Sequence, residues 1–110
     1  MTDTSANRVR ALNDAFRRTL LGGRVVMTAG IAAIAADVRA VIVQRVQFFN
    51  AFDEDNDPYA EHDFGSFEEH GHKVFWKIDC YDRSMTYGSE DAADPTKTTR
   101  VLTIMLAEEY

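Results

Sequence analysis

Residues 64–81 read FGSFEEHGHKVFWKIDCY, and this stretch decides the fold. The period of two from Lys73 to Tyr81 is typical of a β-strand, in which successive side chains point to opposite faces. One face would carry Val74, Trp76, Ile78 and Cys80, and the other would carry Phe75, Lys77, Asp79 and Tyr81. The segment therefore predicts a strand with one apolar face.

A hairpin joins this strand to the residues before it. His70-Gly71 is typical of a two-residue hairpin turn, and Phe64–Glu69 supplies the first strand. The turn fixes the register and predicts three facing pairs, namely Glu68 with Lys73, Phe67 with Val74 and Gly65 with Trp76. The first pair joins opposite charges, and in the last pair the glycine leaves room for the indole.

Helical periodicity precedes the hairpin. Apolar side chains recur at three- and four-residue spacing at Val9, Leu12, Phe16 and Leu20. Thr4 or Ser5 is the predicted N-cap of this helix, and Gly22-Gly23 is its predicted end. A short strand is predicted at Arg24–Thr28, and a second helix from Gly30 or Ile31 to about Asn50.

The segments after the hairpin complete the predicted sheet. Met85–Gly88 is a candidate third strand. Thr98–Ala107 fits a strand or a helix, and its β-branched residues favour a strand. The sequence thus predicts an α+β fold in one domain, residues 1–110. Two N-terminal helices would pack on a small antiparallel β-sheet, a meander of three to four strands.

Composition and charge indicate a soluble cytoplasmic protein. No apolar run approaches the roughly 20 residues that span a bilayer, and no secretory signal is evident. Cys80 is the single cysteine, which suits a reducing compartment. The net charge of −6 is divided unevenly, with +4 in residues 1–50 and −10 in residues 51–110. An acidic surface repels nucleic acid and attracts basic partners, so we expect no direct nucleic-acid or membrane binding.

The acidic residues concentrate in the run DEDNDPYAEHD, Asp53–Asp63. Oxygen ligands at alternate positions are typical of a calcium-binding loop. Pro58 and Phe64, however, stand where such a loop needs a glycine and a bidentate glutamate. We expect instead a solvated loop whose carboxylates form a partner-binding surface, made of Asp53, Glu54, Asp55, Asp57 and Glu61.

The end of the run, Glu61-His62-Asp63, enters the hairpin. Extending the register places His62 opposite Asp79. A His–Asp pair beside further carboxylates could bind a divalent cation or perform acid–base chemistry, with Glu61, His62, Asp63 and Asp79 as candidate residues. The alternative is a structural hydrogen bond that closes the sheet edge. No residue is singled out as catalytic, and we expect no cofactor.

The chain resembles a family of short bacterial proteins classed as a domain of unknown function. The resemblance rests on RALNDAFR at Arg10–Arg17, DNDPYAEHDFG at Asp55–Gly65, FWKID at Phe75–Asp79 and TRVLTIMLA at Thr99–Ala107. It implies a single bacterial domain, often carried on mobile elements, and it brings no assigned activity.

Two functions follow as hypotheses. The first is a protein-interaction module, of the anti-restriction or anti-CRISPR type, whose acidic surface competes with nucleic acid for a basic enzyme; this rests on analogy with small acidic inhibitors. The alternative is a metal-dependent hydrolase that uses Glu61, His62, Asp63 and Asp79. Pairing of exposed strands into a homodimer stays open.

Overall fold

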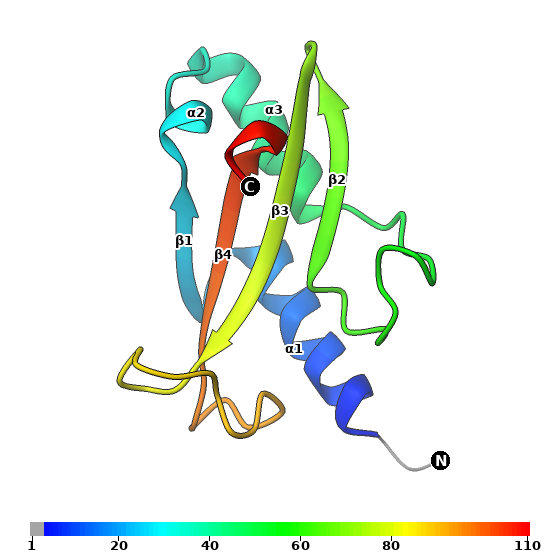
Figure 1. Ribbon diagram of the computed structural model, residues 1–110, viewed down its shortest axis with the longest axis vertical. Coiled ribbons are helices and arrows are strands. Elements are labelled where there is room, and N and C mark those ends of the chain that lie inside the picture. Colours follow the sequence, from blue (N-terminus) through cyan, green and yellow to red (C-terminus); the bar gives the residue numbers. More distant parts are fainter. Residues whose placement is uncertain (1–3) are drawn as a thin grey trace.

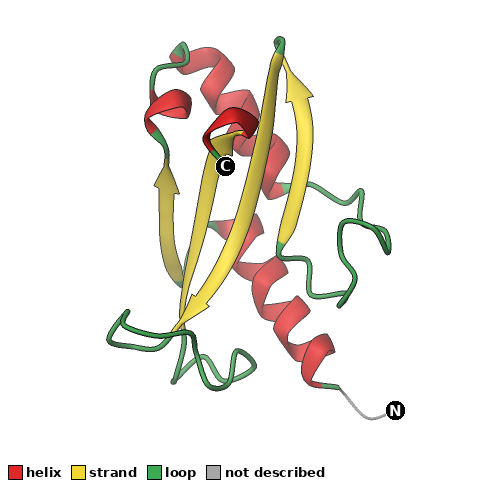
Figure 2. Cartoon of the chain, in the orientation of Figure 1, coloured by secondary structure: helices red, strands yellow, loops and turns green. Residues whose placement is uncertain are grey.

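The computed structural model describes residues 4–110 and places helices against a four-stranded sheet (Figure 1). In chain order the elements are α1 (Ser5–Thr19), β1 (Gly23–Met27), α2 (Ala29–Ala32), α3 (Ala36–Gln47), β2 (Phe64–Glu69), β3 (His72–Tyr81), β4 (Thr99–Leu106) and the 3₁₀ turn η1 (Ala107–Glu109). The helices come first and most of the sheet follows, so the predicted α+β class is confirmed (Figure 2).

The β2–β3 hairpin has the predicted register. Glu68 pairs with Lys73, and Gly65 pairs with Trp76. His70 and Gly71 have φ angles of 51° and 79°, as a two-residue turn of this hand requires. A Cβ added at Gly65 would lie 2.4 Å from Trp76 Nε1, so the glycine is the residue that admits the indole.

The sheet order is β1-β4-β3-β2. β2, β3 and β4 are antiparallel neighbours, whereas β1 runs parallel to β4, so the sheet is mixed. The strand prediction for Thr98–Ala107 is confirmed by β4. The predicted strand at Met85–Gly88 is wrong, because these residues form a turn with a single bridge between Tyr81 and Gly88. Asp82 Oδ1 fixes that turn by accepting the Thr86 N–H at 3.0 Å.

The helices differ from the prediction in their ends. Thr4 caps α1 as expected, since its Oγ1 accepts the Asn7 N–H at 3.0 Å. Leu20, not a glycine, takes the left-handed conformation that ends α1. The single helix predicted up to Asn50 is wrong, because the chain turns between α2 and α3. Arg39 stabilises this break by donating to the carbonyl oxygens of Ala32 and Ile34.

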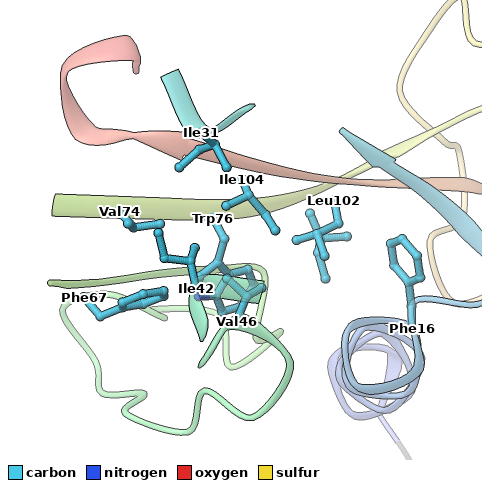
Figure 3. Packing of buried hydrophobic residues seen from close by; sticks show 10 residues of the cluster. Phe16, Ile31, Ile42, Val46, Phe67, Val74, Trp76, Leu102 and Ile104 are labelled. Carbon is cyan, nitrogen blue, oxygen red and sulfur yellow. The ribbon is translucent and has the colours of Figure 1, made fainter. Parts of the chain in front are cut away.

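The core lies between the sheet and the long helices. α1 and α3 lie on the same face of the sheet, behind it in Figure 1. Trp76 from β3 packs with Ile42 and Val46 of α3, and Leu102 of β4 lies toward Phe16 of α1 (Figure 3). Phe64 and Phe75 point to the other face, where Tyr110 packs on both rings. The segment between α3 and β2 runs along α1, to which it is hydrogen-bonded.

Candidate functional site

The acidic segment, residues 53–63, is docked on α1. Arg10 Nη1 donates to the carbonyl oxygen of Ala60 at 3.0 Å, and Asn13 Nδ2 donates to that of Glu61, also at 3.0 Å. Asn13 is buried, and its Oδ1 accepts a hydrogen bond from Arg100 Nε at 2.8 Å. The loop is therefore linked through α1 to the first residues of β4.

Side chains within the segment fix its backbone. Asp53 Oδ1 accepts the N–H groups of Asp55 and Asn56 at 2.9 and 3.0 Å. Asp57 Oδ1 accepts the N–H groups of Glu61 and His62 at 3.0 and 3.1 Å. Such local carboxylate–backbone bonds are alternatives to regular secondary structure, and here they give the loop one shape.

The outer part of the loop carries unpaired charge. Asp53, Glu54 and Asp55 are exposed, and none of them forms an ion pair with a basic side chain of residues 4–110. The sequence places Asp57 on this surface as well, but the structure turns it inward because its Oδ1 accepts the two loop N–H groups. Its side chain is only 4% exposed, and Glu61 is partly buried.

His62 bonds to Asp14 of α1, and within residues 4–110 no hydrogen bond or ion pair joins it to Asp79, which corrects the predicted position opposite Asp79. Its Nδ1 lies 2.9 Å from Asp14 Oδ1, and its ring stacks on Phe52 with centroids 3.8 Å apart. The reason is local: His62 has a φ of 54°, which turns its side chain away from the strand direction. Asp79 pairs instead with Lys77, at 3.0 Å.

The buried side chain of Arg17 also bonds to Asp14, the residue that contacts His62. Arg17 is fully buried, and its Nη2 donates to Asp14 Oδ1 at 3.0 Å. Its Nη1 donates to the carbonyl oxygens of Val46, Gln47 and Phe49, which closes the end of α3. The guanidinium also lies over the Trp76 ring, 4.9 Å from its centroid. Arg17 therefore joins the end of α3, the core and the His62 contact.

Glu61 and Asp63 lie among other carboxylates. Burial raises the pKa of the Asp63 carboxyl above its ordinary value, and the charges of Asp57 and Asp79 raise it further. Burial also raises the pKa of Glu61, with Asp63 and Asp57 adding to the effect. No three His, Cys, Asp or Glu side chains within residues 4–110 lie close enough together to hold a metal ion. The four residues of the hydrolase hypothesis thus do not form a ligand cluster.

The acidic loop borders an open depression of about 430 Å³. Its lining includes Phe52, Asp53, Glu54, Asp57 and His62. Another depression of similar size, about 450 Å³, lies beside the end of α3 and contains no carboxylate. The first depression is the one that combines a histidine, an aromatic ring and several carboxylates.

A family of proteins of unknown function, DUF3768, matches residues 27–109. The chain belongs to this family. No curated protein and no solved structure matches the chain. The DUF3768 region contains the whole acidic segment and the depression, whereas Asp14 and Arg17 lie before it. Among the helices of residues 4–110, none is long and apolar enough to cross a membrane.

Sequence reasoning missed the partners that organise this site. Asp14 and Arg17 belong to one predicted helix, where charged residues off the apolar stripe are ordinarily solvated. Their spacing of three residues along the helix was the one available signal of a pair. Phe52 carried no signal beyond its apolar character, because its contact with His62 depends on the path of the loop.

Proposed function

We propose that the chain is a protein-binding module whose acidic loop occupies the basic, nucleic-acid-binding surface of a partner enzyme. The proposal rests on one observation: the acidic loop has a defined hydrogen-bonded shape, and its exposed carboxylates are not neutralised. Asp53, Glu54 and Asp55 project from a loop that has one hydrogen-bonded shape, and no described basic side chain neutralises them.

Rigidity supports binding because an ordered loop loses little conformational entropy when it meets a partner. The loop is fixed at both ends, by the hydrogen bond from Arg10 to Ala60 and by the internal bonds of Asp53. Preorganised carboxylates can stand where an enzyme expects the phosphates of a nucleic acid.

The negative charge of the chain supports a partner with a basic surface. The chain carries a net charge of −6, and residues 51–110 alone carry −10. A field of this sign accelerates encounter with basic surfaces and disfavours nucleic acid itself. The finer part of the proposal is that the partner belongs to a host defence system, of the restriction or CRISPR type, in the bacterial cytoplasm. Small size and acidity, together with the sequence resemblance noted above, support that part.

The test is capture from bacterial lysate with a matched pair of variants. The loop variant D53N/E54Q/D55N removes three charges, and E68Q/E90Q/E108Q removes three exposed charges elsewhere. The change Asp53→Asn keeps the side-chain oxygen that accepts the loop N–H groups. We expect the wild-type chain and the control to capture a nucleic-acid-processing enzyme at low salt, and the loop variant to lose it.

Two further results bear on the same test. Captured protein should elute as salt is raised, because exposed charges about 10 Å apart are largely screened near 0.1 M ionic strength. Recovery of no nucleic-acid-processing enzyme at low salt, or equal recovery by the loop variant, would overturn the proposal.

A further inference from the structure

We infer that the exposed edge of β1 pairs with β1 of a second copy of the chain, antiparallel and centred on Val25. The two four-stranded sheets then form one continuous sheet through the dimer. The inference does not depend on the proposed function. The acidic segment lies beyond β2, at the other side of the sheet, and stays free in the dimer (Figure 1).

The outer edge of β1 offers backbone groups for a further strand. Thr28 N–H donates to the carbonyl oxygen of Ile104 in β4 at 3.1 Å, and backbone groups point to alternate sides along a strand. The N–H and C=O groups of Gly23, Val25 and Met27 therefore point away from β4. Within residues 4–110, no hydrogen bond from outside the sheet reaches them. Such an edge is a template for another strand.

The opposite edge of the sheet, β2, is protected, whereas β1 is not. Arg45 of α3 donates to the outward carbonyl oxygen of Glu68 at 2.6 Å, and Glu68 itself places a charge on that edge. β1 has the sequence GRVVM, without proline, lysine or a carboxylate. Its apolar side chains Val26 and Met27 are 44% and 38% exposed. Proteins usually block an edge with charge or proline, so β1 is the edge open to pairing.

A second copy supplies matching charge as well as matching backbone. Centred on Val25, the pairing puts Arg24 opposite Val26 of the second copy, so like charges do not face each other. Arg24 is exposed and forms no ion pair within residues 4–110. Its diagonal neighbour is Thr28 of the second copy, whose Oγ1 donates to Glu109 Oε1 at 2.6 Å. Long side chains reach diagonal neighbours, so each Arg24 meets the Glu109 carboxylate of the other copy.

The charge distribution also favours contact at this edge. The net charge of −6 makes two copies repel each other over much of their surface. Residues 19–36, which contain β1, carry a single charged side chain, Arg24. Depletion of charge is typical of the core of an interface. In the same register Leu21, which is 75% exposed, lies beside Ala29 of the second copy and becomes covered.

The experiment measures sedimentation velocity of the full chain between about 1 μM and 1 mM, at about 0.15 M salt. We expect a monomer–dimer equilibrium with a dissociation constant on the order of 10 μM, because a short strand pair is at the small end of specific interfaces. Isotope-filtered NMR of mixed labelled and unlabelled wild-type chains should show contact between the Hα atoms of Arg24 and Val26, which face each other across the dimer axis.

A matched pair of variants tests the register. V26K places a second positive charge opposite Arg24 and should raise the dissociation constant at least about tenfold. V26E removes the same apolar side chain but places a carboxylate there, and should keep the dissociation constant within about threefold of the wild type. S66K adds a charge to the exposed side of β2 and should leave the dimer intact. Circular dichroism verifies that each variant is folded.

The inference fails if the wild-type chain stays monomeric over the whole concentration range. It also fails if V26E dissociates as readily as V26K, or if S66K abolishes the dimer while V26K does not. A dimer without the contact between Arg24 and Val26 would overturn it as well, and this measurement needs no variant. A monomer that still captures an enzyme through its acidic loop would remove only this inference.

Discussion

Asp14 and His62 are 48 residues apart in sequence, and His62 Nδ1 lies 2.9 Å from the Asp14 carboxylate. The same Asp14 oxygen accepts a hydrogen bond from the buried Arg17. One carboxylate thus connects the interior of the domain to the loop that carries its exposed charge. This contact adds to the hydrogen bonds from Arg10 and Asn13 that hold the acidic loop on α1.

Asp14→Asn should loosen the loop. The substitution removes a charge that two donors share, and hydrogen bonds to charged groups contribute about 1.5–3 kcal/mol. We expect the free energy of unfolding to fall by about 2 kcal/mol in urea denaturation. Hydrogen exchange should quicken at Glu61 and His62. Asp55→Asn, on an exposed side chain, should change stability by less than about 0.5 kcal/mol, and an equal loss in both variants would contradict the account.

Arg17→Lys should destabilise the domain more strongly. Lysine keeps the charge but cannot bond Asp14 together with the three carbonyl oxygens at and just beyond the end of α3. Disrupting a buried, paired charge costs about 3–5 kcal/mol, and urea denaturation would measure the loss. Arg18→Lys, at the exposed neighbour, is the control. A loss below about 1 kcal/mol for Arg17→Lys would show that the guanidinium is not the link that we describe.

Gly65→Ala should disrupt the hairpin at Trp76. The added Cβ would lie 2.4 Å from Trp76 Nε1 and 2.8 Å from the Phe49 ring, so the indole must move. Overpacking of this kind costs about 1–3 kcal/mol. Thermal unfolding followed by tryptophan fluorescence would detect both the lower melting temperature and the altered environment of the indole. Gly88→Ala meets its nearest atom at 4.0 Å and should be neutral.

Neutralising Glu61 and Asp63 should stabilise the domain at neutral pH. Burial and neighbouring carboxylates raise the pKa of both groups, so the folded state binds protons more tightly than the unfolded chain does. Their ionisation therefore destabilises the fold as pH rises through the raised folded-state pKa values. E61Q/D63N should melt at a higher temperature than the wild type at about pH 7. The difference should vanish below about pH 3, where both carboxyls are protonated in the folded and the unfolded state.

The control for this pH dependence is D55N/E108Q, which removes two exposed charges. It should show a smaller change at about pH 7 because its groups are solvated. A lower melting temperature for E61Q/D63N than for the wild type at about pH 7 would contradict the assignment.

The hairpin could be predicted because its determinants are local. Two turn residues fix the register, and Gly65 opposite Trp76 is visible in the sequence once that register is known. The break between α2 and α3 could not be predicted, because apolar residues continue on a helical period across it. The parallel pairing of β1 with β4 joins residues far apart in sequence, and no local pattern specifies it.

The candidate site was predictable in composition but not in geometry. The run at Asp53–Asp63 identified the acidic surface, and Asp53, Glu54 and Asp55 are exposed as expected. Extending the strand register to His62 failed, because a left-handed residue ends the ladder there and neither glycine nor asparagine marks it. The inward turn of Asp57 follows from bonds to N–H groups four and five residues later, which a ligand-spacing pattern does not describe.

The central claim is that the acidic loop takes the place of nucleic acid on a basic enzyme. The most direct measurement is the fluorescence anisotropy of labelled duplex DNA bound to the captured enzyme, during titration with the chain at low salt. The account predicts that the wild-type chain displaces the DNA completely. It also predicts that D53N/E54Q/D55N requires at least about tenfold more protein, because three interfacial charges are lost. DNA that stays bound at saturating wild-type chain, or equal displacement by the variant, would contradict the claim.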